Sequence, residues 1–279
     1  MKPSISKLFS KSKIAVATLV LFSFGLFVGF LFSFPALKIK QKIITAIETQ
    51  GDVSIAQGDI NIGFLSIYGS DLRVQPKNTL WPAISINSLK LSPQWLSLLS
   101  TNPGAQLDMQ LFDGTLTADI SRDGTLNLVA SQLNLAFLSQ KDQGMTLSGQ
   151  LETMTLSSVV PLKRTSDSLL TLTLKNVNVS KEGDLKLALN LGDIVIEGTG
   201  RGRSFKMISL KTDRGDLSVT GKGSLLLGRD LSTTRVNMKM EIRPEATVDP
   251  MLLDLLKLGT RQAANGSYEL SLSGSLSDL

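Results

Sequence analysis

The stretch LDMQLFDGTLTADISRDGTLNL, residues 107–128, decides the fold class. Apolar residues alternate with polar ones in three segments, which the dipeptides Asp113-Gly114 and Asp123-Gly124 separate. A period of two puts the apolar side chains of a strand on one face, and Asp-Gly between such runs is a strong hairpin signal. The stretch therefore predicts three consecutive antiparallel strands, each with one apolar and one polar face.

The same alternation begins at Val53 and recurs almost to the end, at residues 170–174, 185–191, 236–242 and 268–272. Parallel strands, buried on both faces, would show continuous apolar runs instead. We therefore expect a mainly β domain over residues 52–279, built from an extended antiparallel sheet.

Helical signals are few. Ser92-Pro93 and Asp249-Pro250 each place a capping side chain before a proline, which predicts short helices at Gln94–Leu99 and Met251–Leu258. Helices this short cannot cover a sheet of about ten strands, so its apolar face needs another partner. A second sheet in a sandwich, the same sheet curled into a groove or barrel, and a bound lipid or protein all remain open.

The N-terminal part predicts a membrane anchor. Residues 14–34 contain no charge and as a helix would be about 32 Å long, enough to cross a bilayer. The run is too long for a cleavable signal peptide, and no small-residue cleavage pattern follows it. We expect an uncleaved inner-membrane anchor with the basic tail 1–13 in the cytoplasm and the rest in the periplasm. Representative anchor residues are Ile14, Leu21, Phe27 and Phe34.

Between anchor and sheet, residues 35–51 predict an amphipathic linker helix. Isoleucines gather on one side, lysines lie elsewhere, and Gly51 can end the helix. Such a helix either packs on the following domain or lies on the lipid surface.

The net charge of +5 does not indicate nucleic-acid binding. Residues 1–37 hold four of the 29 basic residues and no acid, so the rest has 25 basic and 24 acidic residues. A polyphosphate needs a clustered basic face, whereas this basicity is a tail beside the anchor.

Composition also excludes most enzyme chemistry. The chain has no Cys and no His, which rules out disulfides, thiol nucleophiles, Ser-His-Asp triads and imidazole metal ligands. Gly198–Gly202 lacks the third glycine of a dinucleotide loop, and Gly221-Lys222-Gly223 lacks the first glycine and the hydroxyl residue of a phosphate loop. We expect a non-enzymatic protein without cofactor or metal.

Several segments resemble known inner-membrane proteins. The tail, span and linker, followed by GDVSIAQGDI (51–60), SPQWLSLL (92–99) and LFDGT (111–115), resemble the start of AsmA-like proteins. GDLSVTG (215–221), LSTTRVNMKMEIRP (231–244) and NGSYELSLSGS (265–275) resemble the type II secretion system protein N family.

This resemblance implies a scaffold in the machine that moves folded proteins across the outer membrane, with other secretion subunits as partners. A sheet edge offers unpaired backbone groups, so a partner strand could dock by β-augmentation. The candidate docking edge is the last strand, with Tyr268, Leu270 and Leu272.

The alternative function is lipid binding or conduction. AsmA-like and lipopolysaccharide-transport-like proteins use a curled sheet with an apolar inner face for acyl chains, and this chain has one-sided strands, few helices and an anchor. The candidate groove residues are Leu185, Leu187, Leu189, Val236, Met238 and Met240. In a sandwich, the same residues would form a dry core.

Overall fold

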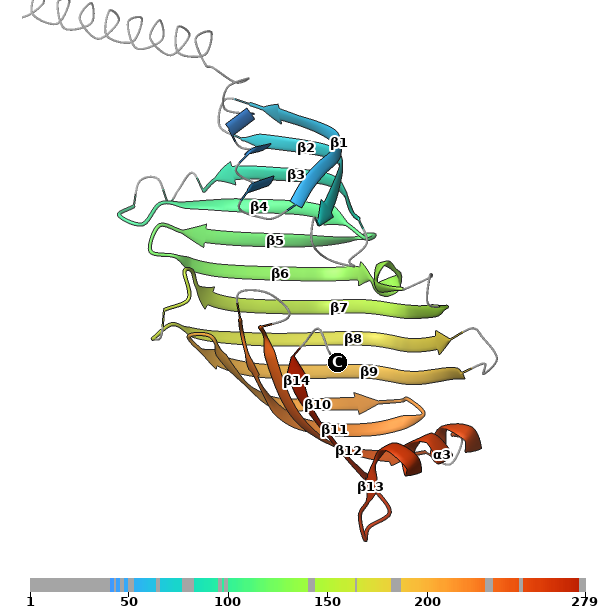
Figure 1. Cartoon of the computed structure of the whole chain (residues 1–279). Helices are drawn as coiled ribbons and strands as arrows, with labels where there is room; N and C mark the ends of the chain where they lie inside the picture. Colours follow the sequence, from blue (N-terminus) through green and yellow to red (C-terminus); the bar gives the residue numbers. More distant parts are fainter. Residues whose placement is uncertain are drawn as a thin grey trace, which may run out of the picture.

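The computed structural model describes residues 41–42, 44–45, 48–49, 53–63, 66–76, 83–94, 97, 100–139, 144–163, 165–181, 187–228, 233–245 and 248–275 (Figure 1). Its elements are β1 (Val53–Ile62), β2 (Ile67–Pro76), β3 (Ile84–Pro93), β4 (Gly104–Leu111), β5 (Gly114–Ser121), β6 (Thr125–Asn134), the 3₁₀ helix η2 (Leu135–Leu138), β7 (Met145–Val159), β8 (Asp167–Lys181), β9 (Leu187–Arg201), β10 (Ser204–Asp213), β11 (Leu217–Leu226), β12 (Arg235–Pro244), α3 (Pro250–Gly259), β13 (Arg261–Gln262) and β14 (Tyr268–Ser275).

These strands form one antiparallel sheet. Each strand from β1 to β12 pairs with the next along the chain, β14 pairs with β12, and the two-residue β13 pairs with β14. The prediction of a mainly β, antiparallel fold is confirmed. The described strands all belong to a single sheet, so they do not form a sandwich of two sheets.

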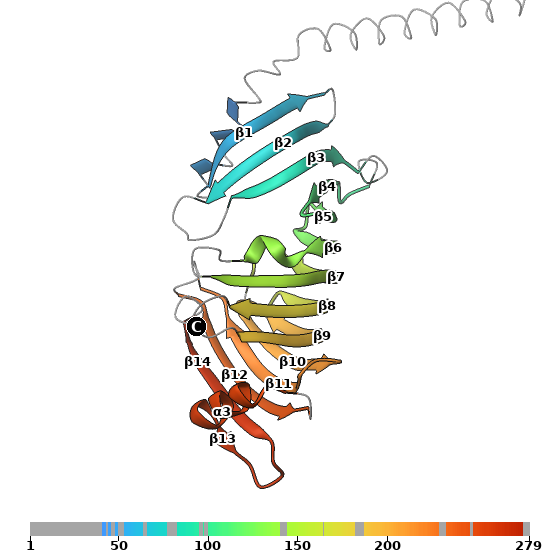
Figure 2. The same cartoon turned by 90° about the vertical axis from the view of Figure 1, so that its right-hand side faces the viewer.

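The sheet twists strongly along its length. Figure 1 shows β5–β9 nearly aligned, whereas β11, β12 and β14 cross them at a steep angle. Figure 2 shows the same change of direction from the side, with β1–β3 at one end and β12–β14 at the other. Right-handed strand twist accumulates in this way when many strands pair in sequence.

The hairpins lie where the Asp-Gly pairs predicted them, with one shift. The first turn centres on Phe112 and Asp113, both at positive φ (50° and 63°), while Gly114 already pairs with Leu111. Two successive positive φ values define the type I′ geometry that matches strand twist. At the second turn Gly124 takes φ 90°, and a Cβ there would lie 2.1 Å from the Val160 carbonyl oxygen.

The helix predicted at residues 251–258 is confirmed as α3. The Asp249 side chain accepts a hydrogen bond from the Met251 N–H (2.9 Å), and Pro250 occupies the first turn. Leu252 is buried against Tyr268 and Ile242 of the sheet. The helix predicted at residues 94–99 lies largely outside the described residues. Within it, Ser97 is described and is in a 3₁₀ turn.

The sheet has an inner face, on which the helices pack, and an outer face. Along one long side of the inner face, η2 contributes Leu135 to one buried cluster and α3 contributes Leu252 to a second. We call this side, with turns 112–113, 135–144, 213–216 and 245–267, the roofed border. The opposite side, with turns 63–66, 94–103, 122–124, 160–166, 202–203 and 227–234, is the open border, and neither cluster contains a residue from its turns.

Residues 41–42, 44–45 and 48–49 are helical. Ile44 packs against the first cluster, and the Glu48 carboxylate accepts a hydrogen bond from the Ile55 N–H (3.3 Å). This part of the predicted linker thus packs on the sheet. The described residues include no helix with the length and apolarity that a bilayer crossing needs. The predicted span at 14–34, with Ile14, Leu21, Phe27 and Phe34, lies outside them.

Candidate functional site

The candidate site is the inner face of the sheet, where cross-strand partners form unbroken apolar rows. The central row passes through every strand from β1 to β12 and ends on β14. In chain order its members are Ile60, Gly69, Leu89, Met109, Leu116, Ala130, Met154, Leu172, Ile196, Leu210, Gly221, Met240 and Leu270. At ~4.8 Å per strand, the row is about 58 Å long.

A second row runs parallel to it on the side of the open border and is equally free of polar residues. Its members are Ile62, Ile67, Leu91, Leu107, Ala118, Leu128, Leu156, Leu170, Gly198, Met207, Gly223, Met238 and Leu272. Together the two rows make an apolar floor that crosses the whole sheet, which we call the apolar band.

The two rows differ in how they are covered. Most side chains of the central row pack against the buried clusters at the roofed border. In the second row only Ile67 belongs to a cluster, and Leu107, Leu128, Leu156, Leu170 and Leu272 are partly exposed. Most of the described long side chains of both rows are partly exposed, and the central row in addition packs against the buried clusters. The band is therefore more open toward the open border, and we call this apolar surface the trough.

Glycines on the inner face allow neighbouring side chains to lie flat on the sheet. A Cβ on Gly200 would come within 2.8 Å of the Phe205 ring, and one on Gly223 within 2.8 Å of the Met238 Cγ. Gly223 lies in β11, one of the strands that cross β5–β9 at a steep angle in Figure 1, and Gly200 lies in β9. Aromatic or flexible side chains over glycines keep an apolar surface where the strands bend.

One polar pair interrupts the next row toward the open border. Ser158 and Ser168, both buried, share a hydrogen bond of 2.7 Å between their Oγ atoms, between Leu126 on one side and Gly200 on the other. Because each hydroxyl satisfies the other, this row stays without an unpaired buried polar group.

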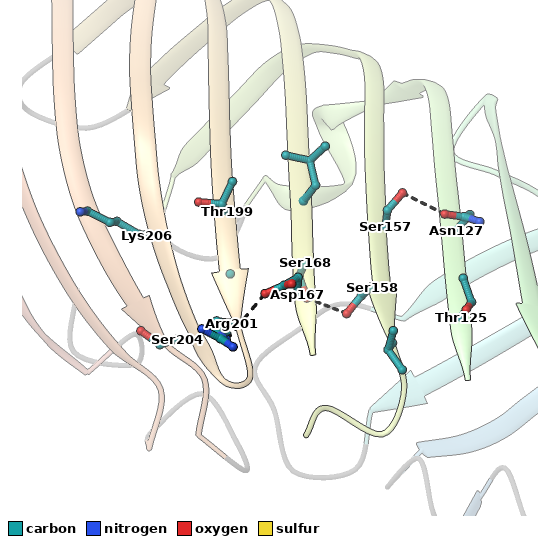
Figure 3. Close-up of a pocket in the computed structure, with 13 residues that line it drawn as sticks. Thr125, Asn127, Ser157, Ser158, Asp167, Ser168, Thr199, Arg201, Ser204 and Lys206 are labelled. Atoms are coloured by element: carbon teal, nitrogen blue, oxygen red, sulfur yellow. Dashed lines mark hydrogen bonds and ion pairs between the residues drawn. The ribbon is translucent and has the colours of Figure 1, made fainter. Parts of the chain in front are cut away.

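The outer face carries hydroxyl, amide and charged side chains instead. At the open-border ends of β6–β10 it is hollowed into a pocket of about 790 Å³ (Figure 3). Asn127 and Ser157 are hydrogen-bonded there (2.8 Å), and Arg201 lies 3.9 Å from Asp167. The other side chains around the hollow include Thr125, Thr199, Ser204 and Lys206. The sequence reasoning missed this hollow, because it forms only where the ends of five successive strands, β6–β10, line up along one border of the sheet.

The best-enclosed ionic group lies near the roofed border. Asp193, with 12 % of its side chain exposed, accepts hydrogen bonds from the Asn176 N–H and the Lys175 ammonium, both at 3.1 Å. Arg214 lies 3.7 Å away. The N–H of Asn176, and then Lys175, lower the pKa of Asp193 below its ordinary value, so this carboxylate stays charged at neutral pH.

The predicted groove residues are only partly brought together. Met240 lies in the central row, Met238 in the second row, and buried Val236 pairs with Leu225 and Gly274 in the next. Leu189 packs against the second cluster at the roofed border. Leu185 lies outside the described residues, and Leu187 begins β9 with a side chain that is not described.

The predicted docking edge is divided by the structure. Tyr268 is buried and pairs with Ile242 of β12 on one side and Gln262 of β13 on the other. Leu270 and Leu272 pair with β12 alone among the described strands. The backbone edge open to a partner therefore begins at Leu270, and Tyr268 belongs to the core.

Among the described residues, no group of three or more acidic side chains is placed to hold a metal ion. Gly198–Gly202 lies in β9 and the turn after it, and Gly221–Gly223 lies within β11, so neither is a nucleotide-binding loop. Comparisons of the chain with protein-family models, curated proteins and solved structures found no match.

Proposed function

We propose that this chain is a non-enzymatic membrane-anchored protein that holds the hydrocarbon chains of lipids in its trough. The observation that carries the proposal is the apolar band, two rows without a polar residue across thirteen strands. With ~6.8 Å between rows, the two rows together span about 800 Å² of the sheet, and most of their described long side chains are partly exposed.

Hydrocarbon chains suit this surface better than a protein partner does. The floor offers no hydrogen-bond donor, acceptor or charge along about 58 Å, so it cannot fix the register of a polar ligand. A flexible acyl chain needs no register and gains roughly 0.8 kcal/mol for each CH₂ that leaves water. The predicted span at residues 14–34 would hold the sheet within reach of a bilayer that supplies such chains.

Neighbouring residues of β8 provide a matched test. Leu170 lies on the floor in the second row, whereas Leu169 is 52 % exposed on the outer face. A photoreactive amino acid would replace each in turn in the full chain, in cells, and adducts would be identified by mass spectrometry. We expect lipid adducts from position 170 and few from position 169. Equal lipid labelling at both positions, or none at position 170, would refute lipid binding.

A second candidate function is docking in the type II secretion machinery, which the sequence resemblance implies. The specific observation in its favour is the edge of β14, where residues 270–274 pair with β12 alone among the described strands. These residues include no proline and no charge, the features that usually protect an edge from pairing. A partner strand there would continue the sheet.

The edge can be tested with the same chemistry. Ser271 and Ser273 lie on the open part of β14, whereas Glu269 pairs with Arg261 of β13. A photoreactive probe at position 271 or 273 should capture a secretion subunit, and the same probe at position 269 should capture much less. Absence of protein adducts from 271 and 273, with the fold intact, would remove the docking function.

A further inference from the structure

The two long borders of the sheet differ in charge. We count for each border its turns and the two residues at each strand end. The described charged residues of the open border are the bases Arg122, Lys163, Arg201, Arg203 and Arg235 and the acids Asp123 and Asp167. Those of the roofed border are the acids Asp113, Asp213, Asp216, Glu245, Asp249, Asp254 and Glu269 and the bases Lys181, Arg214, Arg243, Lys257 and Arg261. Over these described residues the open border is basic, whereas acids outnumber bases at the roofed border.

The cations of the open border are available for a ligand. Among the described residues, Arg122, Arg203 and Arg235 have no carboxylate within 4.0 Å and are exposed. Among the residues that the structure describes at this border, Arg201 and Asp167 form an ion pair at 3.9 Å, with side chains 73 % and 85 % exposed. Such an exposed pair contributes little and can open for a competing anion.

The two described acids of this border offset only two of its five described positive charges. Asp123 is used inside its own turn, where its carboxylate accepts a hydrogen bond from the Thr125 N–H (2.9 Å). This hydrogen bond lowers the pKa of Asp123, so the carboxylate stays charged and is held within its own turn. The polar hollow adds Lys206 and several hydroxyl groups beside Arg201 at the same border (Figure 3).

The position of the border relative to the trough determines what these cations can meet. The second row of the band lies toward the open border, while η2 and α3 pack at the other side of the inner face. The head of a lipid whose chains lie on the band must leave the trough at the open border, because polar groups do not remain over an apolar floor. It would emerge among the guanidinium groups, whose planar fork binds phosphate oxygens in pairs.

We infer that the trough selects anionic lipids and that Arg122, Arg203 and Arg235 bind their headgroup phosphates along the open border. This inference rests on the proposed lipid-binding function and adds the class of lipid. The headgroups would be arranged along the border while their acyl chains share the floor of the trough.

The test uses the full chain in an amphipathic polymer, incubated with vesicles of equal parts phosphatidylglycerol and phosphatidylcholine. Both lipids carry the same acyl chains, so only the headgroup differs. Bound lipids would be extracted and their ratio measured by mass spectrometry. We expect enrichment of the anionic lipid by about fivefold or more, as ~1 kcal/mol per basic residue at an anionic surface predicts.

A triple variant, Arg122→Glu with Arg203→Glu and Arg235→Glu, should abolish this enrichment and still bind lipid. The matched control is Lys211→Glu with Lys222→Glu and Lys239→Glu, which makes the same change of charge at exposed mid-strand positions of the outer face. That control should keep the enrichment. All six positions are exposed, so circular dichroism should show an unchanged sheet in both variants.

The outcomes separate this inference from the function on which it rests. Lipid bound without headgroup preference, or an equal loss in both triple variants, would overturn the headgroup inference and leave the trough standing. Absence of any bound lipid would overturn both. If glycerol phosphate, which has no acyl chain, displaced the anionic lipid at equal concentration, the border would be a site for free phosphate and the inference would also fail.

Discussion

The Oγ atoms of Ser158 and Ser168 lie 2.7 Å apart on adjacent strands, each side chain buried, in a row that is otherwise apolar beside them. Each hydroxyl supplies the hydrogen bond that replaces the water lost when the other is buried. The two hydroxyls therefore act as one unit. If one is removed, the other stays buried without a hydrogen-bond partner, and the folded state is destabilised.

Ser158→Ala or Ser168→Ala alone should lower the free energy of unfolding by about 1–3 kcal/mol, because a buried hydroxyl loses its partner. The double Ala variant should be less destabilised than the sum of the two single variants. Urea unfolding of the full chain, followed by circular dichroism of the β signal, measures all three. Strictly additive effects would show that the hydroxyls do not depend on each other.

The carboxylate of Asp193 should make the free energy of unfolding depend on pH in the acid range. Its pKa is lowered in the folded protein, so the native state binds fewer protons than the unfolded chain. Its contribution is present above the ordinary Asp pKa of 3.8 and is lost as pH falls through the lower folded value.

Asp193→Asn should consequently lower the urea midpoint at pH 7 and show a smaller deficit near pH 3. Asp213→Asn is the control, because Asp213 is 75 % exposed and lies 4.0 Å from Arg214. A deficit for Asp193→Asn that is the same at both pH values would contradict the ionic role.

The inner-face glycines should not be interchangeable. A Cβ on Gly223 would lie 2.5 Å from the Asn237 carbonyl oxygen, whereas one on Gly274, on the same face, would meet nothing within 4 Å. Gly223→Ala should cost about 1–3 kcal/mol because the backbone of β12 must shift, and Gly274→Ala should be nearly neutral. Thermal unfolding of the two variants side by side measures this difference, and a neutral Gly223→Ala would show that the strands separate freely there.

The N-cap of α3 should determine how firmly the roof is held at this end. Asp249→Ala removes the hydrogen bond to the Met251 N–H and should cost about 1 kcal/mol. Asp254→Ala removes only an exposed ion pair with Lys257 and should cost less. Hydrogen exchange at α3, read by mass spectrometry, should rise in the first variant alone. A similar rise in both would mean that general surface charge, and not the cap, holds the helix.

The sequence alone was sufficient to predict the alternation typical of strands, two of the hairpin turns and α3, because these depend on neighbours in the chain. Leu107 to Leu128 alternate apolar and polar residues, and each Asp-Gly pair interrupts that alternation at a turn. Asp249 and Pro250 mark the start of a helix through contacts within one turn. The predicted N-terminal anchor stays a prediction, since it lies outside the described residues.

Only the tertiary structure decided that these strands make one sheet, and which apolar residues line the trough. Alternation shows which side chains of a strand share a face. The register between strands decides which of them become cross-strand neighbours, as Leu128, Leu156 and Leu170 do on β6, β7 and β8. Of the groove residues predicted from the sequence, Met238 and Met240 lie in the band, whereas Leu189 lies outside both rows. The sequence reasoning grouped Tyr268 with the edge because it could not see β13 pair there. Register and cover are long-range properties, set by the twist of all the strands together, and no local pattern contains them.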